Sequence, residues 1–406
     1  MNLKKIIHEL NYLKAEDFIQ IFVFILSLLP ALVYKLYIKL TKKEIWLICE
    51  DKMEARDNGY CFFRYMNEAD RGVTTYYAIS RKSADLEKAK SVGKTVGYGS
   101  LGHWILYFAC RYNISSQKAG KPNAAVCYVL EVFGIIKSKA VFLQHGITIN
   151  RAEWLFFENT KIKKFICGAK PEFDYINEHF GYPEGSVLYT GFSRFDDYHG
   201  IAPDKKQIVL MPSWREWIAS KNEYSKEFED TKDFTNTEYF KKYEELISSK
   251  ELDTLLKENG IIMYFYPHRN MQKYIDSFKS GSENIIIVDN KTSDIRELLI
   301  KSAAMITDYS SVALDFAYMK KPVIYYQFDE ERFRKAQYAE GYYSYRDAGL
   351  GTVCLGLEET IGRLRELIDK NFEPDQKFIA AHSEFFPIWD NKNSERIYNE
   401  LKNSNN

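Results

Sequence analysis

Short apolar runs alternate with longer segments of helical periodicity over most of the chain after residue 43. The runs are rich in β-branched and aromatic residues and predict two successive sets of strands. The first set covers 45–49, 74–79, 112–115, 140–144, 164–167 and 187–190; the second covers 207–211, 261–266, 284–288, 303–307, 322–326 and 351–354. Helical segments lie between them, for example at 238–258, 293–301 and 357–370. This alternation is typical of parallel sheets covered by helices on both faces, so we expect an α/β protein.

Two sets of strands in series predict two doubly wound, Rossmann-like domains. Between the sets, residues 197–205 combine Gly, Pro and charge without apolar periodicity, and we place the domain boundary there. We therefore expect domains over 44–198 and 199–375, followed by helices over 376–406 that can pack back on the first domain.

An uncharged stretch of 17 residues, 18–34, precedes the first predicted strand, and four lysines follow it without an intervening acid. As a helix it spans about 25 Å, less than the roughly 30 Å hydrocarbon core of a bilayer. Pro30 interrupts it, and acids stand where a signal peptide carries basic residues. We expect residues 1–43 to be membrane-associated through 18–43, with the helix lying in the interface and the lysines facing anionic headgroups. A buried core helix is the alternative.

Composition narrows the classes of function. The 56 Lys and Arg residues balance the 56 Asp and Glu residues, which argues against a protein that coats nucleic acid through a basic excess. Residues 1–43 hold seven lysines and three acids, so the balance is the sum of a basic N-terminal segment and an acidic remainder. The six cysteines lie mostly in apolar runs without a C-x-x-C pair, which favours buried, reduced thiols.

In the first domain, the predicted strand 140–144 leads directly into Gln144, His145 and Gly146. Ligands of open α/β sheets bind at the carboxyl ends of strands, and Gly146 allows a turn that aims the imidazole there. Because the pKa of histidine suits proton abstraction near neutral pH, His145 is a candidate general base. A capping histidine without a chemical role is the alternative.

In the second domain, cationic residues follow two of the predicted strands. His268 and Arg269 come after 261–266, and Arg215 comes after 207–211. Arginine can bind phosphate oxygens with two hydrogen bonds, so cations that converge on strand ends suit a phosphate ligand. Each residue alone fits an ordinary surface cation, and only their convergence indicates a site.

The most informative segment follows the predicted strand 303–307 and contains Asp308, Ser310, Ser311 and Asp315. Ser310 or Ser311 can cap a helix that continues to 319, and the N-terminus of that helix and the two hydroxyls can hold a diphosphate. Asp315 lies one turn further along the same face, where it can accept hydrogen bonds from ribose hydroxyls. An ordinary serine-capped helix is the alternative.

These residues together resemble the CDP-glycerol glycerophosphotransferase family, the bacterial polyol-phosphate transferases of teichoic acid and capsule synthesis. The resemblance covers roughly residues 45–395 and is most specific at 307–315. It also rests on segments 57–65, 144–146, 181–183, 190–196, 212–215 and 266–268. Two features depart from the family pattern: Arg269 stands where a proline often follows the second histidine, and the chain is far shorter than the large polymerases.

The resemblance implies a GT-B fold with an N-terminal acceptor domain, a C-terminal CDP-polyol domain and chemistry in the cleft between them. Together with the residues above, it predicts that His145 acts as the general base. The predicted site assigns catalysis to His145 and His268, the donor pyrophosphate to Arg215, His268, Arg269, Ser310 and Ser311, the donor ribose to Asp315, and the cleft lining to Gln144, Gly146 and Asp308.

We therefore expect transfer of glycerol phosphate or ribitol phosphate from CDP-glycerol or CDP-ribitol to a hydroxyl of a lipid-linked glycan, with release of CMP. The expected place is the cytoplasmic face of the bacterial cell membrane, with peripheral or monotopic attachment. No obligatory cofactor or metal is expected, because no D-x-D or carboxylate cluster is well placed. A GT-B glycosyltransferase that uses a nucleotide sugar and a catalytically silent membrane scaffold are the alternatives.

Overall fold

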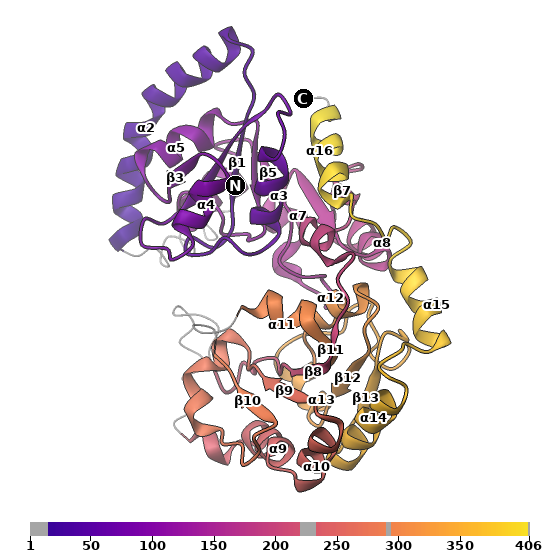
Figure 1. Cartoon of the computed structure of the whole chain (residues 1–406). Coiled ribbons are helices and arrows are strands. Elements are labelled where there is room, and N and C mark those ends of the chain that lie inside the picture. The colour runs from indigo at the N-terminus through magenta and orange to yellow at the C-terminus, as the bar shows by residue number, and fades with distance from the viewer. Residues whose placement is uncertain (1–14, 220–232, 290–293, 405–406) are drawn as a thin grey trace. The chain divides into compact units, whose positions relative to one another are not determined.

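The computed structural model describes residues 15–219, 233–289 and 294–404 and contains two compact α/β units (Figure 1). The first unit comprises described residues 15–147, 153–197 and 390–404, and the second comprises 148–152 and 198–389 apart from the undescribed gaps. Apart from residues 148–152, the chain passes from the first unit to the second between Asp197 and Tyr198 and returns to the first at Asp390. The N-terminal helix belongs to the first unit.

The first unit is built on a parallel sheet of seven strands in the order β3-β2-β1-β4-β5-β6-β7. Apolar and aromatic side chains of β1 face the core, where Trp46 lies beside Tyr112 of β4. The strands are β1 (Ile45–Cys49), β2 (Thr74–Ile79), β3 (Thr95–Gly97), β4 (Tyr112–Ser115), β5 (Ala140–Phe142), β6 (Lys164–Cys167) and β7 (Val187–Tyr189).

Helices from both ends of the chain complete the first unit. The C-terminal helix α16 (Asn393–Asn403) returns to it, since Arg396 donates to the main-chain oxygen of Thr190 at 2.9 Å and Tyr112 donates to that of Leu401 at 3.1 Å. The other helices are α2 (Ala15–Leu40), α3 (Asn58–Asn67), α4 (Leu86–Val92), α5 (Leu101–Ala109), α6 (Ala124–Val132), α7 (Phe157–Thr160) and α8 (Lys170–His179), with short 3₁₀ turns η1 (Glu153–Leu155) and η2 (Ser193–Tyr198).

The second unit is built on a parallel sheet of six strands in the order β10-β9-β8-β11-β12-β13. Its core packs the sheet residues Leu210, Ile306 and Tyr326 against Tyr243 and Leu256 of the covering helices. The strands are β8 (Asp204–Leu210), β9 (Ile262–Phe265), β10 (Ile285–Ile287), β11 (Ser302–Thr307), β12 (Val323–Tyr326) and β13 (Thr352–Cys354).

One predicted helix of the second unit is two helices. The pattern over 238–258 predicts a single helix, but the chain breaks at Ser248 and Ser249, and the Ser249 hydroxyl caps the second helix by accepting from Leu252 N at 3.3 Å. Residue 293 of the predicted segment 293–301 lies outside the described residues. The helical elements are η3 (Phe234–Asn236), α9 (Glu238–Ile247), α10 (Lys250–Asn259), η4 (Arg269–Ser277), α11 (Ile295–Lys301), α12 (Val312–Tyr318), α13 (Glu330–Ala336), α14 (Leu357–Asp369) and α15 (Gln376–Phe385).

The expected fold class, two parallel doubly wound α/β units, is confirmed. In each sheet the strand order reverses once, between β1 and β4 in the first unit and between β8 and β11 in the second. Ligands of open α/β sheets bind outside the carboxyl ends of the strands at such a reversal. The six cysteines, all within the described ranges, are buried thiols without disulfide bonds, as expected.

Candidate functional site

The second unit brings the predicted donor-site segments together at the carboxyl ends of β9, β8 and β11, which are neighbouring strands. The main-chain N–H of His268 donates to Pro212 O at 3.1 Å, and that of Ser213 donates to a carboxylate oxygen of Asp308 at 2.8 Å. The ring of His268 also lies 6.3 Å from that of Trp214. Three segments far apart in the sequence thus meet where the strand order reverses.

Ser310 and Ser311 are half-buried and lie just before α12. The Ser310 hydroxyl accepts from Val312 N at 3.3 Å, whereas the Ser311 side chain makes no cap hydrogen bond. The hydroxyl that holds the first turn of α12 is therefore that of Ser310. Both residues lie shortly after the carboxyl end of β11.

His268 and Arg269 lie at the start of η4. The His268 Nδ1 atom accepts a hydrogen bond from Asn270 N at 3.2 Å, so a neutral imidazole carries its proton on Nε2. Arg269 is exposed. This geometry gives the site one fixed histidine and one cation at the surface.

Arg215 is buried in ion pairs with two carboxylates, which the sequence did not predict. Its side chain is 0% exposed and forms two hydrogen bonds with Asp329, at 2.7 and 2.9 Å, and one with Asp308 at 2.9 Å. A direct contact between Arg215 and a donor phosphate would require the guanidinium to leave both carboxylates. Sequence reasoning also missed Asp329, because its partner lies 114 residues earlier in the chain.

Asp308 was expected to line the cleft, but its side chain is also 0% exposed. Burial acts to raise the pKa of Asp308, yet the positive charge of Arg215 and hydrogen bonds from Ser213 and Tyr309 hold that pKa below its ordinary value. Tyr243 donates to the same carboxylate at 2.9 Å. The buried ion pair of Asp308 and Arg215 therefore holds together the segments that follow β8 and β11.

Asp315, the predicted ribose ligand, is 2% exposed in α12. The Tyr198 hydroxyl donates to its Oδ2 atom at 3.0 Å. Tyr198 is the first residue after the division between the two units, so this hydrogen bond ties the start of the second unit to α12.

In the first unit, His145 is exposed and follows β5, which ends at Phe142, two residues sooner than predicted. The residue with a left-handed backbone in this turn is Gln144, with φ 60°, and not Gly146 as expected. A left-handed conformation costs a residue with a side chain roughly 1–2 kcal/mol. The turn that presents His145 therefore depends on contacts that hold Gln144.

Those contacts come from three other segments of the first unit. The Gln144 side-chain amide donates to Ile166 O at 2.7 Å and to Glu172 at 2.9 Å. The Asn58 side-chain amide donates to Gln144 O at 2.7 Å. Gln144, predicted to line the cleft, is buried and positions the chain next to His145.

Asn58 also links the two early motifs of the first unit. Its Oδ1 atom accepts from Arg194 N at 3.1 Å, and the Arg194 guanidinium pairs with Asp57 at 2.8 Å. A Cβ atom at Gly59 would lie 2.8 Å from the main-chain oxygen of Cys49, so the close approach of α3 to the end of β1 requires glycine. The motifs at 57–65 and 190–196 thus meet the strand end that bears His145.

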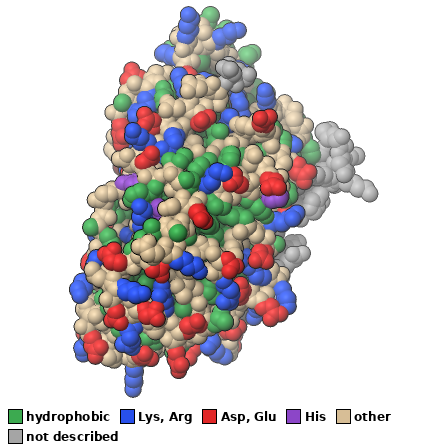
Figure 2. Space-filling model, turned by 90° about the vertical axis from the view of Figure 1, so that its right-hand side faces the viewer, with side chains coloured by type: hydrophobic (Ala, Val, Ile, Leu, Met, Phe, Trp, Pro, Cys, Tyr) green, Lys and Arg blue, Asp and Glu red, His purple; other side chains and the backbone are tan. Residues whose placement is uncertain are grey.

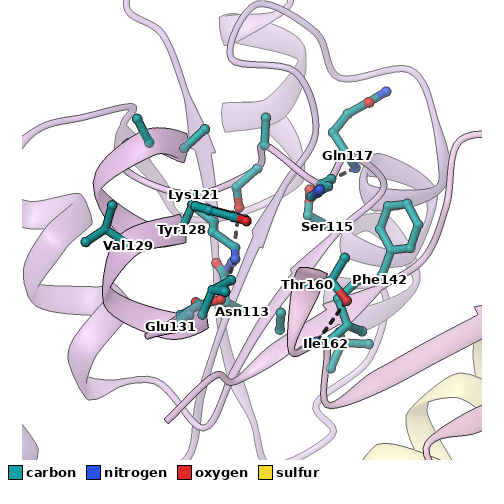
Figure 3. Close-up of a pocket in the computed structure, with 18 residues that line it drawn as sticks. Asn113, Ser115, Gln117, Lys121, Tyr128, Val129, Glu131, Phe142, Thr160 and Ile162 are labelled. Atoms are coloured by element: carbon teal, nitrogen blue, oxygen red, sulfur yellow. Dashed lines mark hydrogen bonds and ion pairs between the residues drawn. The ribbon is translucent and has the colours of Figure 1, made fainter. Parts of the chain in front are cut away.

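A cavity of about 480 Å³ lies in the first unit between α6 and strands β4 and β5 (Figure 3). Inside it, Lys121 and Glu131 form an ion pair at 2.5 Å, and the Asn113 side chain donates to Gly120 O at 3.0 Å. Most of the other lining side chains are apolar, a composition typical of small-molecule sites. None of the predicted site residues lines this cavity, and no motif in the sequence marks it.

Helix α2 packs one side against the first unit, where Phe24 and Ile38 lie against the apolar core and a few polar residues form hydrogen bonds. Gln20 accepts from the Trp104 indole at 2.9 Å, Asp17 accepts from Asn123 at 2.7 Å, and Ser27 is fully buried. The outward side is mostly apolar, with Leu29 71% and Leu40 74% exposed, and it also carries the exposed Lys35 and Lys39. The alternative of a buried core helix is therefore wrong, although the helix is long and apolar enough to cross a membrane by length and composition.

Comparisons with known proteins agree with this architecture. The chain is 30% identical over 385 residues to the minor teichoic acid biosynthesis protein GgaB of Bacillus subtilis (strain 168). This alignment covers 92% of the present chain and 41% of GgaB. It is 26% identical over 236 residues to a teichoic acid poly(glycerol phosphate) polymerase of Bacillus spizizenii, covering 54% of this chain and 52% of that protein. The chain thus spans about half the length of these curated relatives or less.

The solved structure of the wall teichoic acid polymerase TagF superposes with a TM-score of 0.66 at 17% identity, over 96% of this chain and 98% of that one. This likeness confirms the expected two-domain fold. The family described as CDP-Glycerol:Poly(glycerophosphate) glycerophosphotransferase matches residues 31–403. Because that match covers nearly the whole sequence, the chain belongs to the CDP-glycerol glycerophosphotransferase family.

Proposed function

We propose that the chain transfers a polyol phosphate, either glycerol phosphate or ribitol phosphate, from a CDP-activated donor to a hydroxyl of a lipid-linked glycan in teichoic acid or capsule synthesis. The observation that carries the proposal is that His268 follows β9 while Ser310 and Ser311 follow β11, so they lie on either side of β8 at the carboxyl edge of the second sheet. Strand ends at a reversal of strand order are where such sheets bind nucleotides, and the family supports a CDP-linked donor.

In the proposed reaction, His145 takes the proton of the acceptor hydroxyl while that oxygen bonds to the β-phosphorus of the donor. The bond between the β-phosphorus and the bridging oxygen breaks, and CMP leaves with the bonding electron pair. Exposure of His145 supports this role, because a general base must reach an acceptor that arrives from outside. Positioning and charge stabilisation can carry such a phosphoryl transfer without a covalent intermediate.

The donor phosphates are assigned to His268, Arg269, Ser310 and Ser311. The Nε2–H of His268 and the two hydroxyls supply hydrogen bonds, and Arg269 supplies the positive charge that stabilises the leaving phosphate. Asp315 is assigned to the ribose hydroxyls. Arg215 contributes indirectly, by holding Asp308 in place beneath the serines.

The test is product formation by the purified full chain with a membrane lipid extract as acceptor. CDP-glycerol, CDP-ribitol and UDP-sugars are supplied separately, release of CMP or UDP is measured, and the product is analysed by mass spectrometry. We expect CMP release and one added polyol phosphate mass with one of the two CDP-polyols. Release of UDP with transfer of a sugar would instead make the protein a glycosyltransferase, and absence of donor binding in calorimetry would indicate a silent scaffold.

We also propose that α2 lies in the membrane interface at the cytoplasmic face, where nucleotide-activated donors are available. The exposed apolar face of α2 supports this position, because burial of such a face in the membrane interface removes it from water. Contacts of α2 with Trp104 on the inner side favour a helix that lies along the unit over one that leaves it to span the bilayer.

Membrane attachment is tested best with substitutions on the outer face. Removal of residues 1–43 would uncover α5 and confound attachment with folding, because Phe24 packs on Trp104 at 5.5 Å. The double variant Leu29→Gln and Leu40→Gln should move the protein into the soluble fraction. The control is Leu355→Gln, a half-exposed leucine of the second unit, which should remain with membranes. Equal membrane retention of the two variants would mean that another surface attaches the protein.

A further inference from the structure

A strongly basic groove runs beside the C-terminal half of α2, within the first unit. It has a volume of about 840 Å³, and eight of its 16 lining residues are lysine or arginine, while Glu44 is the one acid among them. The face of the molecule drawn in Figure 2 differs, since acidic and basic side chains are mixed over it. A groove of this composition is suited to a ligand with more than one negative charge.

The single acid does not neutralise the groove. Glu44 accepts from Arg111 at 2.8 Å and also from Lys402 at 2.7 Å, so its charge is shared between two cations. The Trp46 indole donates to the same carboxylate at 2.8 Å. The remaining lysines of the groove therefore have no carboxylate in the groove lining left to pair with.

Some lysines of the groove are held by the protein and others are not. Lys139 is held by the structure, since its ammonium donates to Phe108 O at 2.6 Å and Cys110 O at 2.8 Å, at the end of α5. Within the described ranges, the ammonium groups of Lys35, Lys39 and Lys137 make no hydrogen bond or ion pair. These three exposed lysines are available to a ligand.

The pKa of Lys163 is affected by the positive charges of the groove. Its pKa is lowered first by burial and then by the neighbouring charges of Lys137, Arg111, Lys164 and Lys139. Its ammonium lies 5.1 Å from the centre of the Tyr112 ring. A cation that is disfavoured by its neighbours becomes stable when an anion enters among them.

The groove is continuous with apolar surface on two sides. Leu32 and Leu36 line it and also belong to the outward face of α2, where they are exposed. A second cavity of about 290 Å³ shares Lys35, Lys137 and Lys139 with the groove and is otherwise lined by Tyr107, Phe108 and Ile136. A ligand that has both phosphate and hydrocarbon parts matches this pairing of surfaces.

We propose that this groove binds the phosphate headgroup of an anionic membrane lipid, with the phosphate among Lys35, Lys39, Lys137 and Lys163 and a hydrocarbon chain along Leu32 and Leu36. The inference rests on the proposed position of α2 in the membrane interface and adds the class of lipid that the protein selects there. The proposal is for a defined binding site with fixed lining residues, and not for the general attraction of lysines to a charged surface.

The test is binding of the full chain to vesicles of phosphatidylcholine alone and of phosphatidylcholine mixed with phosphatidylglycerol in equal parts, at one fixed salt concentration. The wild type should prefer the mixed vesicles. The double variant Lys137→Ala and Lys163→Ala should lose roughly tenfold or more of that preference, since each lysine near an anionic surface contributes about fivefold. The matched control, Lys82→Ala with Lys250→Ala, removes the same charge from exposed positions outside the groove.

A second arm separates a lipid from a free phosphate. Calorimetry compares dihexanoyl phosphatidylglycerol, kept below its micellar concentration, with glycerol 3-phosphate. We expect the short-chain lipid to bind and the double variant to lose this binding. Equal affinity for glycerol 3-phosphate would overturn the assignment to a lipid.

The remaining outcomes are also decisive. Equal losses of preference in the groove variant and in its control would show diffuse attraction and overturn the built site. Equal binding of the wild type to both kinds of vesicle would overturn the groove while leaving α2 as the membrane contact. Absence of binding to either vesicle would overturn both proposals. Thermal unfolding of each variant shows whether a loss arises from unfolding.

Discussion

The side-chain amide of Asn58 donates a 2.7 Å hydrogen bond to the main-chain oxygen of Gln144, the residue directly before His145. The two residues are 86 positions apart in the sequence. The same Asn58 side chain accepts from the main chain at Arg194, so one buried amide joins three segments around the exposed histidine. The position of His145 therefore depends on Asn58, a residue outside the proposed catalytic set.

Replacement of Asn58 should therefore impair turnover more than folding. Asn58→Ala leaves Gln144 O and Arg194 N without their partner, which should cost about 1–3 kcal/mol of stability and release the left-handed turn. We expect kcat to fall while KM for the CDP-polyol changes little, because the residues proposed to bind the donor belong to the second unit. The control is Asn67→Ala in the same helix, which loses hydrogen bonds to Phe63 O and Thr75 but none near Gln144. Equal kcat in the two variants would contradict the positioning role.

Replacement of His145 tests the general base directly. Loss of a general base slows a reaction typically by about 10²–10⁴-fold, so His145→Gln should lower CMP release by that order. Because His145 is exposed, the midpoint of thermal unfolding should stay close to that of the wild type. Turnover near the wild-type rate in this variant would remove His145 from the reaction.

The same substitution should lower stability at Arg215 and weaken donor binding at Arg269. Arg215→Leu leaves Asp308 and Asp329 buried without a counter-charge, which should destabilise the second unit by about 3–5 kcal/mol. Arg269→Leu removes an exposed cation, so stability should change by about 0.5 kcal/mol or less while KM for the donor rises. Chemical denaturation and donor titration separate the two effects. A raised KM with unchanged stability in Arg215→Leu would restore Arg215 as a direct phosphate ligand.

His103 should make the first unit sensitive to acid. Burial lowers the pKa of His103 to about 3, and its Nδ1 atom accepts from Gly99 N at 3.0 Å, as only a neutral ring can. In the unfolded chain the pKa is about 6.5, so between these values the unfolded state binds more protons. Stability is therefore complete above about pH 6.5 and falls by about 1.4 kcal/mol per pH unit as the pH drops toward 3.

The variant His103→Gln checks this pH dependence. Its side-chain oxygen can still accept from Gly99 N, but it does not titrate. Urea unfolding at about pH 7 and about pH 4.5 should show a smaller loss of stability in this variant than in the wild type. The control His179→Gln changes an exposed histidine and should keep the wild-type slope. Identical slopes in all three proteins would show that His103 is not the group responsible.

The strands could be predicted from the sequence because buried strands are rich in apolar, β-branched and aromatic residues. β1, β2, β4 and β6 have the predicted bounds, since each is a short run that contains β-branched and aromatic residues. The break between α9 and α10 was missed because the apolar periodicity continues through Ser248 and Ser249, and only the cap of Ser249 shows the interruption.

The sequence predicted that the candidate site residues follow strands, but it did not predict which contacts these residues make. His145, His268, Ser310 and Ser311 follow strands, and the parallel sheets place them accordingly. The burial of Arg215 with Asp329 could not be predicted, because an arginine that binds phosphate and one that binds two carboxylates look alike in sequence. The turn at Gln144 was assigned to Gly146 for a similar reason, since glycine is the usual residue with a left-handed backbone.

The return of α16 to the first unit has a consequence for the order of folding during synthesis. Residues 198–389, which belong to the second unit, leave the ribosome before residues 390–404, which the first unit needs. Until then, Tyr112 lacks its partner at Leu401, and Asp196 lacks the two hydrogen bonds that it accepts from Asn393. The second unit can therefore fold first, although most of it comes later in the chain, and the first unit becomes complete only after residues 390–404 have been synthesised.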